Sequence, residues 1–212
     1  MTQHRHEKQT RRDFLKRSLA IPAALLVGPA TAALAQQGGL RPTPACGDEG
    51  DITPIQTEGP YFRPSSPSRA SLLEHGMPGT RMVVTGLVLS TQCTPIRRAL
   101  LDFWHADERG EYDNVGFRLR GHLFTDENGR YRLETIVPGL YPGRTRHFHV
   151  KVQAPNQPVL TTQLYFPDEP WNARDSIFSR DLVMKVEDAG GGKLGRFDFV
   201  LDDQLRRNRS RR

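Results

Sequence analysis

From residue 81 onward, hydrophobic and polar residues alternate over short stretches and never settle into a long helical period. Runs rich in Val, Leu and aromatic residues are separated by polar turns; the runs span residues 81–90, 98–105, 119–125, 131–137, 146–153, 159–166, 182–186 and 196–201. Asn128-Gly129, between the third and fourth runs, is a strong hairpin signal. The pattern predicts an all-β fold: an antiparallel β-sandwich with long loops and few short helices.

The region before these runs is rich in Gly, Pro and Thr. We therefore expect residues 36–80 to form an irregular arm and residues 81–202 to form the core of the sandwich. Short helical turns are expected near residues 68–74 and 172–176. The chain of 212 residues is long enough for one domain with a sizeable core.

The first 35 residues have the pattern of a targeting segment. An arginine pair at 11–12 precedes an apolar run over 19–34, which ends in an Ala-x-Ala cleavage sequence at 33–35. We expect residues 1–35 to be a twin-arginine signal peptide and the mature protein to be periplasmic or extracellular. The alternative is an uncleaved anchor, but the apolar run is broken by Pro and Gly and is shorter than the roughly 20 apolar residues of a stable span. We therefore expect no stable membrane anchoring.

The basic character of the chain is confined to its ends. The sequence carries 30 Lys and Arg against 24 Asp and Glu, a formal net charge of +6. Six of the basic and two of the acidic residues lie in the predicted signal peptide, and five arginines lie in the last seven residues. The body between them is slightly acidic, without a basic stripe, which argues against nucleic-acid binding. Residues 203–212 are expected to be a basic disordered tail.

The two cysteines, Cys46 and Cys93, leave two interpretations open. In an exported protein they can form one disulfide, but spacing does not fix the geometry, and two separate buried thiols are equally compatible. Two cysteines are too few for a cysteine-rich zinc site, so a metal centre would need other ligands.

Candidate ligands of that kind occur around the fifth predicted strand, which contains His147-Phe148-His149. Side chains two apart on a strand point to the same face, so both imidazoles converge while Phe148 faces the other way. Tyr141 precedes the strand across a Pro-Gly turn, and Tyr112 follows an earlier strand. Two imidazoles with two phenolates favour a hard trivalent ion, because zinc and copper sites usually use His, Cys or carboxylate ligands.

Charge neutrality indicates what such a centre could bind. Fe(III) with two tyrosinates and a hydroxide has no net charge, which a partly buried pocket tolerates. A catechol that loses both protons can replace one tyrosinate and the hydroxide without changing that charge. The two displaced bases can accept the two protons, so the ligand set suits ortho-dihydroxybenzenes.

Several segments carry a family pattern: TEGPYF at 57–62, WHADERGEY at 104–112, RGHLFTD at 120–126, GRY at 129–131, TIVPGLY at 135–141, RTRHFH at 144–149 and TQLYF at 162–166. In this order and spacing they resemble the intradiol ring-cleavage dioxygenases, particularly the protocatechuate and hydroxyquinol type and small exported relatives. The segments cover most of the chain after the predicted signal peptide. Together they are highly specific, although no single segment would be.

The resemblance implies one non-haem Fe(III) per chain with four protein ligands: Tyr112, Tyr141, His147 and His149. It assigns to Tyr141 the axial position that is vacated when the substrate chelates. It assigns to Arg144 the stabilisation of a ketonised, carbanion-like substrate, and to Gln163 a place in the pocket. The substrates would be a catechol and O2, and the ring would open between the two hydroxyl-bearing carbons to give a cis,cis-muconate.

Other interpretations stay open. A non-catalytic β-sandwich module that binds carbohydrate or a partner could share the fold, and a zinc hydrolase could use the histidine pair, although no acidic base is obvious nearby. A cupin-type site would need a glutamate soon after His149, and residues 150–158 contain none. His105 and His122 are expected to be structural and Arg146 to lie at the rim. The ring substituent is not indicated. The long N-terminal helical region of the catechol 1,2-dioxygenase branch has no counterpart, so its dimer is not predicted, while a homo-oligomer stays possible.

Overall fold

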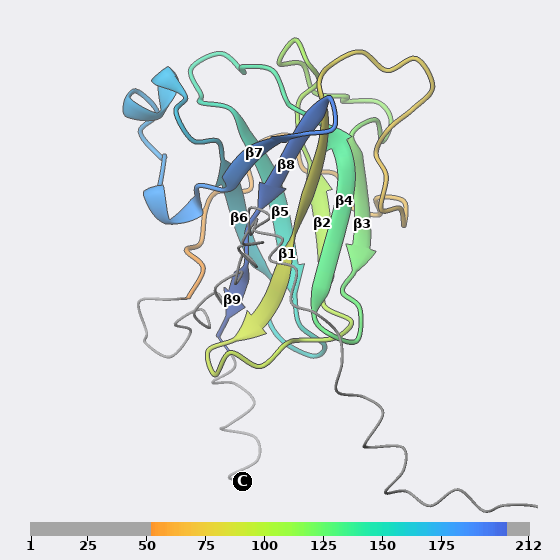
Figure 1. The fold of residues 1–212 in the computed structure, drawn as a ribbon, viewed down its shortest axis with the longest axis vertical. Helices are drawn as coiled ribbons and strands as arrows, with labels where there is room; N and C mark the ends of the chain where they lie inside the picture. The colour runs from red at the N-terminus through yellow and green to blue at the C-terminus, as the bar shows by residue number, and fades with distance from the viewer. Residues whose placement is uncertain (1–51, 203–212) are drawn as a thin grey trace, which may run out of the picture. The chain divides into compact units, whose positions relative to one another are not determined.

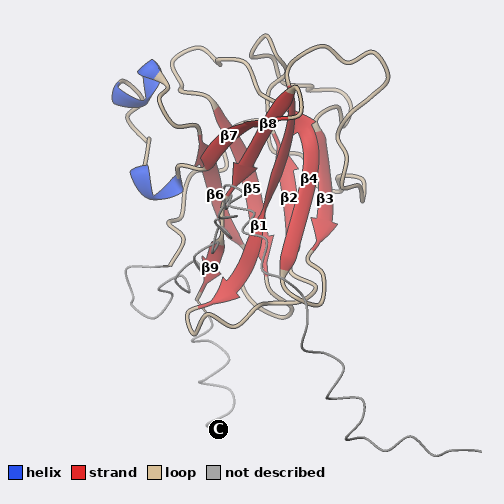
Figure 2. Ribbon diagram, viewed as in Figure 1, coloured by secondary structure: helices blue, strands red, loops and turns tan. Residues whose placement is uncertain are grey.

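The computed structural model describes residues 52–202, all of which belong to one compact unit. The strands are β1 (Arg81–Ser90), β2 (Leu100–Trp104), β3 (Arg120–Phe124), β4 (Arg130–Ile136), β5 (His147–Gln153), β6 (Leu160–Tyr165), β7 (Lys185–Ala189), β8 (Gly192–Arg196) and β9 (Phe199–Leu201). Two single-turn 3-10 helices, η2 (Pro170–Ala173) and η3 (Arg180–Leu182), accompany them (Figure 1). Strands in two sheets dominate the described part (Figure 2), which confirms the all-β prediction.

Some expectations concern residues outside this range. The predicted signal peptide at 1–35, the first part of the arm at 36–51 and the predicted tail at 203–212 are not among the described residues. Cys46 also lies outside them, whereas Cys93 is disulfide-bonded. Between residues 52 and 202, neither helix has the length and apolar character that crossing a membrane requires.

The first sheet has the order β3-β2-β5-β6 and is antiparallel throughout. The register places Trp104, at the end of β2, opposite His149 of β5, and His149 opposite Gln163 of β6. Three residues that the sequence singled out on separate strands are therefore neighbours on this sheet.

The second sheet has the order β4-β1-β8-β7, with β9 also pairing with β1. Its β1–β4 and β7–β8 pairs are antiparallel, but β8 and β9 both run parallel to β1. The predicted β-sandwich is therefore antiparallel apart from these two pairs with β1. The parallel partners of β1 come late in the chain, after β7, so long connections and no hairpin link them to β1.

The last predicted strands are displaced from their expected positions. The run expected at 182–186 forms β7 only from Lys185, and the run at 196–201 is divided between the end of β8 and β9. Gly190 and Gly191 have φ angles of 56° and 83° and form the turn of a β7–β8 hairpin. β7 is largely exposed and β8 is mostly half-buried, so they lack the hydrophobic alternation that identified the others.

The helical turn expected at 68–74 was wrong, whereas the one expected at 172–176 overlaps η2. Ser68 and Ser71 are extended and form isolated bridges to His122 of β3 and Glu134 of β4. The backbone polar groups of this segment are thus satisfied by strand edges, and a local helix is not needed.

The arm from residue 52 crosses the outward face of the first sheet. It begins beside β6, where Gln56 N–H bonds to Thr161 O at 2.9 Å, and it ends beside β3, where Arg69 N–H bonds to His122 O at 2.8 Å. Between them, Phe62 packs on Trp104 with ring centroids 4.9 Å apart. The first sheet is therefore covered on both faces.

The opposite face of β5 supplies the core. Phe148, Val150 and Val152 are fully buried against residues of the second sheet. Burial of side chains of this size stabilises the fold by about 1.5–3 kcal/mol each. Because residues alternate along β5, this packing fixes His147 and His149 on the other face, beneath the arm.

Candidate active site

The two histidines of β5 lie with their Nε2 atoms 3.1 Å apart. His147 Nδ1 donates to Thr145 O at 2.6 Å, so in the neutral ring Nε2 carries a lone pair. Burial lowers the pKa of His147 to about 4 and holds the pKa of His149 well below its ordinary value. Both rings are neutral near pH 7, and a cation at Nε2 would meet no competing imidazolium charge.

His149 is oriented by packing. Its ring stacks on Trp104 with centroids 4.9 Å apart and an interplanar angle of 6°. Gly59 of the arm has a φ of 70°, and a Cβ there would lie 3.3 Å from His149 Cε1. The arm backbone thus covers this ring closely, and a glycine suits the position because of both its φ and the limited space.

Tyr112 lies beside the histidine pair. Its Oη is 3.3 Å from His147 Nε2. Burial raises the pKa of Tyr112 well above its ordinary value, although the positive charges of Arg144 and Arg120 act in the opposite direction. A bound cation would invert this balance and favour the phenolate, which is the form that binds metals.

Tyr141 is placed next to the other tyrosines, and its hydroxyl bonds to a tyrosine and not to either histidine. Its Oη lies 2.8 Å from Tyr61 Oη, and its ring meets Tyr112 edge-on at 5.9 Å between centroids. Tyr61 in turn stacks on Tyr112 at 4.4 Å. The structure therefore gathers three tyrosines, of which Tyr61 lies in the TEGPYF segment and was not selected as a site residue.

The donor set decides which metals fit. Within residues 52–202, no group of three His, Cys, Asp or Glu side chains is placed to hold a metal ion. A metal at this site would therefore need the phenol of Tyr112 together with the two imidazoles. Phenolate oxygen with imidazole nitrogen suits a hard ion such as Fe(III) and not a typical zinc site. The facing Nε2 atoms and the adjacent Oη fit such an ion.

Arg144 reaches the same region from the loop before β5. Its Nη2 donates to Gln163 Oε1 at 2.7 Å, and its Nε donates to Asp175 Oδ2 at 2.8 Å. Gln163 is fully buried and its Nε2 donates to Thr57 O of the arm at 2.9 Å. Arg144 and Gln163, both selected from the sequence, are therefore in direct contact.

Two supporting residues were not selected as site residues. Arg120 is 2% exposed, and its guanidinium donates to Tyr61 O at 2.5 Å and to Asp113 O at 2.8 Å. It joins the segments that carry Tyr61 and Tyr112. Asp175 follows η2 and is also buried. Both residues bind backbone groups of other segments, and no local sequence pattern indicates such contacts. The RGH segment around Arg120 belongs to the family pattern, but it did not indicate what Arg120 binds.

Comparison with known proteins gives the family. A family model described as Dioxygenase matches residues 57–203, a range that contains every candidate site residue named above. The chain belongs to the intradiol ring-cleavage dioxygenases.

Individual dioxygenases support the assignment. The dioxygenase domain of a dioxygenase carbohydrate-binding protein fusion from the cellulolytic bacterium Streptomyces sp. SirexAA-E is 58% identical, with a TM-score of 0.70, and the match covers 71% of this chain and 98% of that one. Catechol 1,2-dioxygenase 2 of Acinetobacter lwoffii is 32% identical over 72% of this chain and 66% of that enzyme. Catechol 1,2-dioxygenase of Candida albicans is 27% identical over 68% of this chain, and the match spans only 58% of its length.

His105, His122 and Arg146 have structural partners in this dioxygenase fold. His105 Nδ1 donates to Ala106 O at 2.7 Å, and its Nε2 accepts from Thr135 Oγ1 at 2.6 Å. His122 Nδ1 bonds to Ser66 Oγ at 3.1 Å. Arg146 Nε pairs with Glu169 at 2.7 Å. These contacts confirm the expectation that both histidines are structural and leave Arg146 half-buried.

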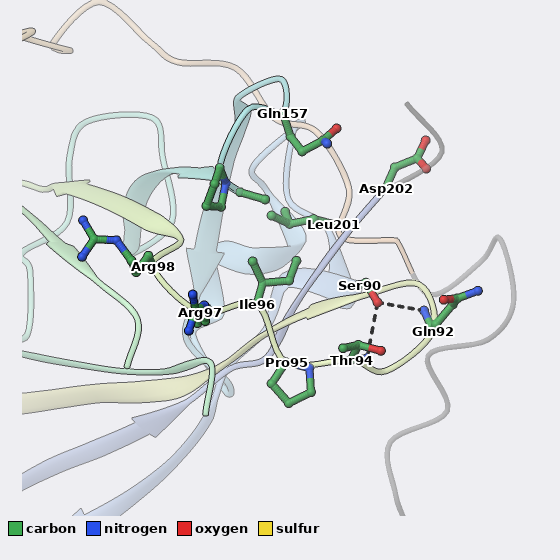
Figure 3. A pocket seen from close by; sticks show the side chains of 12 residues that line it. Ser90, Gln92, Thr94, Pro95, Ile96, Arg97, Arg98, Gln157, Leu201 and Asp202 are labelled. Carbon is green, nitrogen blue, oxygen red and sulfur yellow. Dashed lines mark hydrogen bonds between the residues drawn. The ribbon is translucent and has the colours of Figure 1, made fainter. Parts of the chain in front are cut away.

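A larger hollow lies at the other end of the dioxygenase sandwich. Its volume is about 540 Å³, and it is lined by residues around the end of β1, the start of β2 and the end of β5 (Figure 3). Ser90 Oγ there accepts hydrogen bonds from Gln92 N–H and Thr94 N–H. The described lining contains no histidine or tyrosine. A smaller cavity of about 300 Å³ is lined in part by Tyr112, whereas the larger hollow includes none of the candidate site residues.

Proposed function

We propose that this protein cleaves catecholic rings between the two hydroxyl-bearing carbons, using O2 and one ferric ion, to give cis,cis-muconate-type products. The proposed iron ligands are Tyr112, Tyr141, His147 and His149. The observation that carries the proposal is the placement of two neutral imidazoles, with Nε2 atoms 3.1 Å apart, directly beside the phenol of Tyr112.

When bound, the ferric ion would act as a Lewis acid toward the two catechol oxygens. Tyr112 and the two histidines would hold it at buried positions that the sheet and the arm fix. Tyr141 is only partly buried, and its Oη already has a partner in Tyr61. A proton that reaches Tyr141 Oη could therefore be shared with Tyr61, which suits the ligand expected to leave.

Arg144 supplies positive charge where the substrate ring would accumulate negative charge. Its guanidinium is held at two points, by Gln163 and by Asp175, and both partners are buried. A fixed donor of this kind needs no reorganisation during the reaction and is worth more in a low-dielectric pocket than in water. Gln163 in turn is fixed by Thr57 O.

The substrate class follows from the named relatives. They act on catechol, chlorocatechol, hydroxyquinol and protocatechuate, which share adjacent ring hydroxyls. We propose a catechol derivative for this chain as well. The twin-arginine pattern supports action outside the cytoplasm.

Oxygen uptake with product identification tests the function. The iron-loaded full-length protein is mixed with catechol, protocatechuate, hydroxyquinol and substituted catechols. At least one should be consumed with one O2 per ring and yield a muconate-type product, and the His149→Ala variant should not do so. Iron-replete protein that binds a catechol without taking up oxygen would instead identify a non-catalytic binding module.

A further inference from the structure

The loop before β5 is tied to the segment after β6 by one buried carboxylate. Asp175 is 7% exposed and lies just beyond η2. Its Oδ2 accepts from Arg144 Nε at 2.8 Å and from Thr145 N–H at 2.9 Å, and its Oδ1 accepts from Ile177 N–H at 3.1 Å. One side chain therefore fixes the guanidinium of Arg144 and the peptide that follows it.

That peptide leads to a proposed iron ligand. Thr145, whose N–H bonds to Asp175, accepts the hydrogen bond of His147 Nδ1 at its own carbonyl, at 2.6 Å. The carboxylate thus also helps to fix the residue that sets the tautomer of His147. A hydrogen bond to the other ring nitrogen is how a histidine ligand is commonly oriented.

The segment that carries Asp175 is itself firmly held. Asn172 Oδ1 accepts from Thr145 Oγ1 at 2.7 Å, and its Nδ2 donates to Phe166 O at 2.9 Å. Tyr165 Oη donates to Ile177 O at 3.1 Å. The position of Asp175 is therefore set by the contacts of its own segment and does not depend on Arg144.

The charge state of Asp175 agrees with this contact set. Burial alone would raise its pKa, but hydrogen bonds from Thr145, Arg144 and Ile177 outweigh burial and leave the pKa below its ordinary value. The group is a carboxylate near pH 7 and can offset the buried charge of the guanidinium.

We propose that Asp175 is a positioning residue for ring cleavage, which holds Arg144 at the angle needed to face the substrate and supports His147 through Thr145. The inference rests on the proposed function. Asp175 has no contact that would place it on the substrate, so it would act only through the residues it orients.

The chain offers a matched control in Arg146 and Glu169. This ion pair joins the same two segments, with Arg146 Nε 2.7 Å from Glu169 Oε1, and both side chains are about one-fifth exposed. The guanidinium of Arg146 bonds to Glu169 and to Pro138 O, away from the histidine pair and the tyrosines. If activity depended only on how firmly the two segments are held together, Glu169→Gln would reduce it as well. If activity depends on the position of Arg144 and His147, only Asp175→Asn would reduce it.

The test measures kcat and KM of the full-length iron protein for its best catechol, and the hydrogen exchange of the Arg144 Nε–H by NMR in the metal-free full-length chain. Asp175→Asn should lower kcat by about 10- to 100-fold with a much smaller change in KM, and should speed the Nε–H exchange. Glu169→Gln should change neither. Asp175→Glu, which keeps the charge but displaces it, should give an intermediate kcat and serves if Asp175→Asn does not fold.

The outcomes separate the two proposals. An active wild type together with an Asp175→Asn variant within about twofold of its kcat, or an unchanged Nε–H exchange, overturns the role of Asp175 alone. A wild type that takes up no oxygen with any catechol overturns the proposed function, and the positioning role falls with it. Equal losses of kcat in Asp175→Asn and Glu169→Gln would show that both residues only hold the two segments together, and would also overturn the inference.

Discussion

His147, His149 and Tyr112 form a site whose protonation states favour a cation. Burial lowers the pKa of both histidines and raises the pKa of Tyr112, so without a metal the site contains two neutral imidazoles and a neutral phenol. A ferric ion would use both lone pairs and displace the phenol proton. This donor set is what the proposed ferric centre requires.

Removal of the Tyr112 hydroxyl tests its proposed role as an iron ligand. Tyr112→Phe should keep the ring stacked on Tyr61 but remove the oxygen beside His147, so iron affinity and kcat/KM should each fall by at least about tenfold. Iron analysis, the visible spectrum and oxygen uptake measure this.

Tyr131→Phe is the control for that change. Tyr131 Oη donates to Phe197 O at 2.9 Å in the core, away from the site. This variant should lose about 1 kcal/mol of stability and keep full colour and activity. Equal iron content in both variants would contradict the role of Tyr112.

Residues with ligand chemistry could be found from the sequence, whereas their supports could not. His147 and His149 share a face because strand residues alternate, and the tyrosines complete a recognisable donor set. Asp175 and Arg120 act by hydrogen bonds to backbone groups of distant segments. Such contacts depend on how loops pack, which no local pattern encodes.

At the scale of elements, the loops that carry Tyr112 and Tyr141 pack backbone against backbone. Gly139 N–H bonds to Asp107 O at 2.6 Å. Gly110 has a φ of 89°, and a Cβ on it would lie 2.1 Å from Leu140 O. The absence of a side chain at Gly110 is thus what allows the two tyrosines to share one site.

We expect Gly110→Ala to destabilise the protein by at least about 2 kcal/mol and to weaken iron binding, since the loops must separate. Thermal unfolding and iron analysis check this. Gly190→Ala is the control: its φ of 56° is also left-handed, but a Cβ there meets nothing within 4 Å. Gly190→Ala should reduce the free energy of unfolding by about 1 kcal/mol and leave iron binding intact. Equal loss of iron in both variants would contradict the importance of the close approach of Gly110 to Leu140 O.

Arg120 joins two further segments, because its guanidinium bonds to the carbonyls of Tyr61 and Asp113. Arg120→Gln should leave buried carbonyls unpaired and reduce the free energy of unfolding by about 3 kcal/mol, with a shift in the colour of the iron protein. The side chain of Arg118 is half-exposed, and the nearest carboxylate oxygens lie 3.6 and 3.8 Å from its guanidinium. Arg118→Gln should therefore reduce the free energy of unfolding by less than about 1 kcal/mol. Denaturant unfolding measures the stability of both variants. Equal stability of the two would contradict the role of Arg120 in joining the two segments.

The strands with buried alternation were located from the sequence to within a few residues, but edge features were not. The β7–β8 hairpin has one largely exposed strand and one half-buried strand, and it carries little hydrophobic pattern. The parallel pairing of β1 with β8 and β9 depends on a long return of the chain. The segment at 68–74 is extended because strand edges supply its hydrogen bonds.

At the scale of the whole molecule, buried neutral histidines couple stability to pH. His105 is 1% exposed with both ring nitrogens bonded, and burial lowers its pKa to about 4. The unfolded chain binds a proton there below about pH 6.5 while the folded protein does not. The stability is therefore complete above pH 6.5 and falls as the pH drops toward 4.

His105 should contribute a loss of up to about 3 kcal/mol over that window. Denaturant unfolding of the metal-free protein at a series of pH values measures it. The His105→Gln variant should be less stable at pH 7 and show a flatter pH profile. An identical profile in the variant would mean that His105 is not the group responsible.

The proposed function requires a ferric centre with tyrosinate ligands at Tyr112 and Tyr141 beside His147 and His149. The visible absorption spectrum of the iron-loaded protein, recorded together with its iron content, tests it most directly. We predict one iron per chain and a burgundy colour from tyrosinate-to-iron charge transfer, diminished or shifted in Tyr112→Phe. A colourless protein with a full complement of iron would contradict the account.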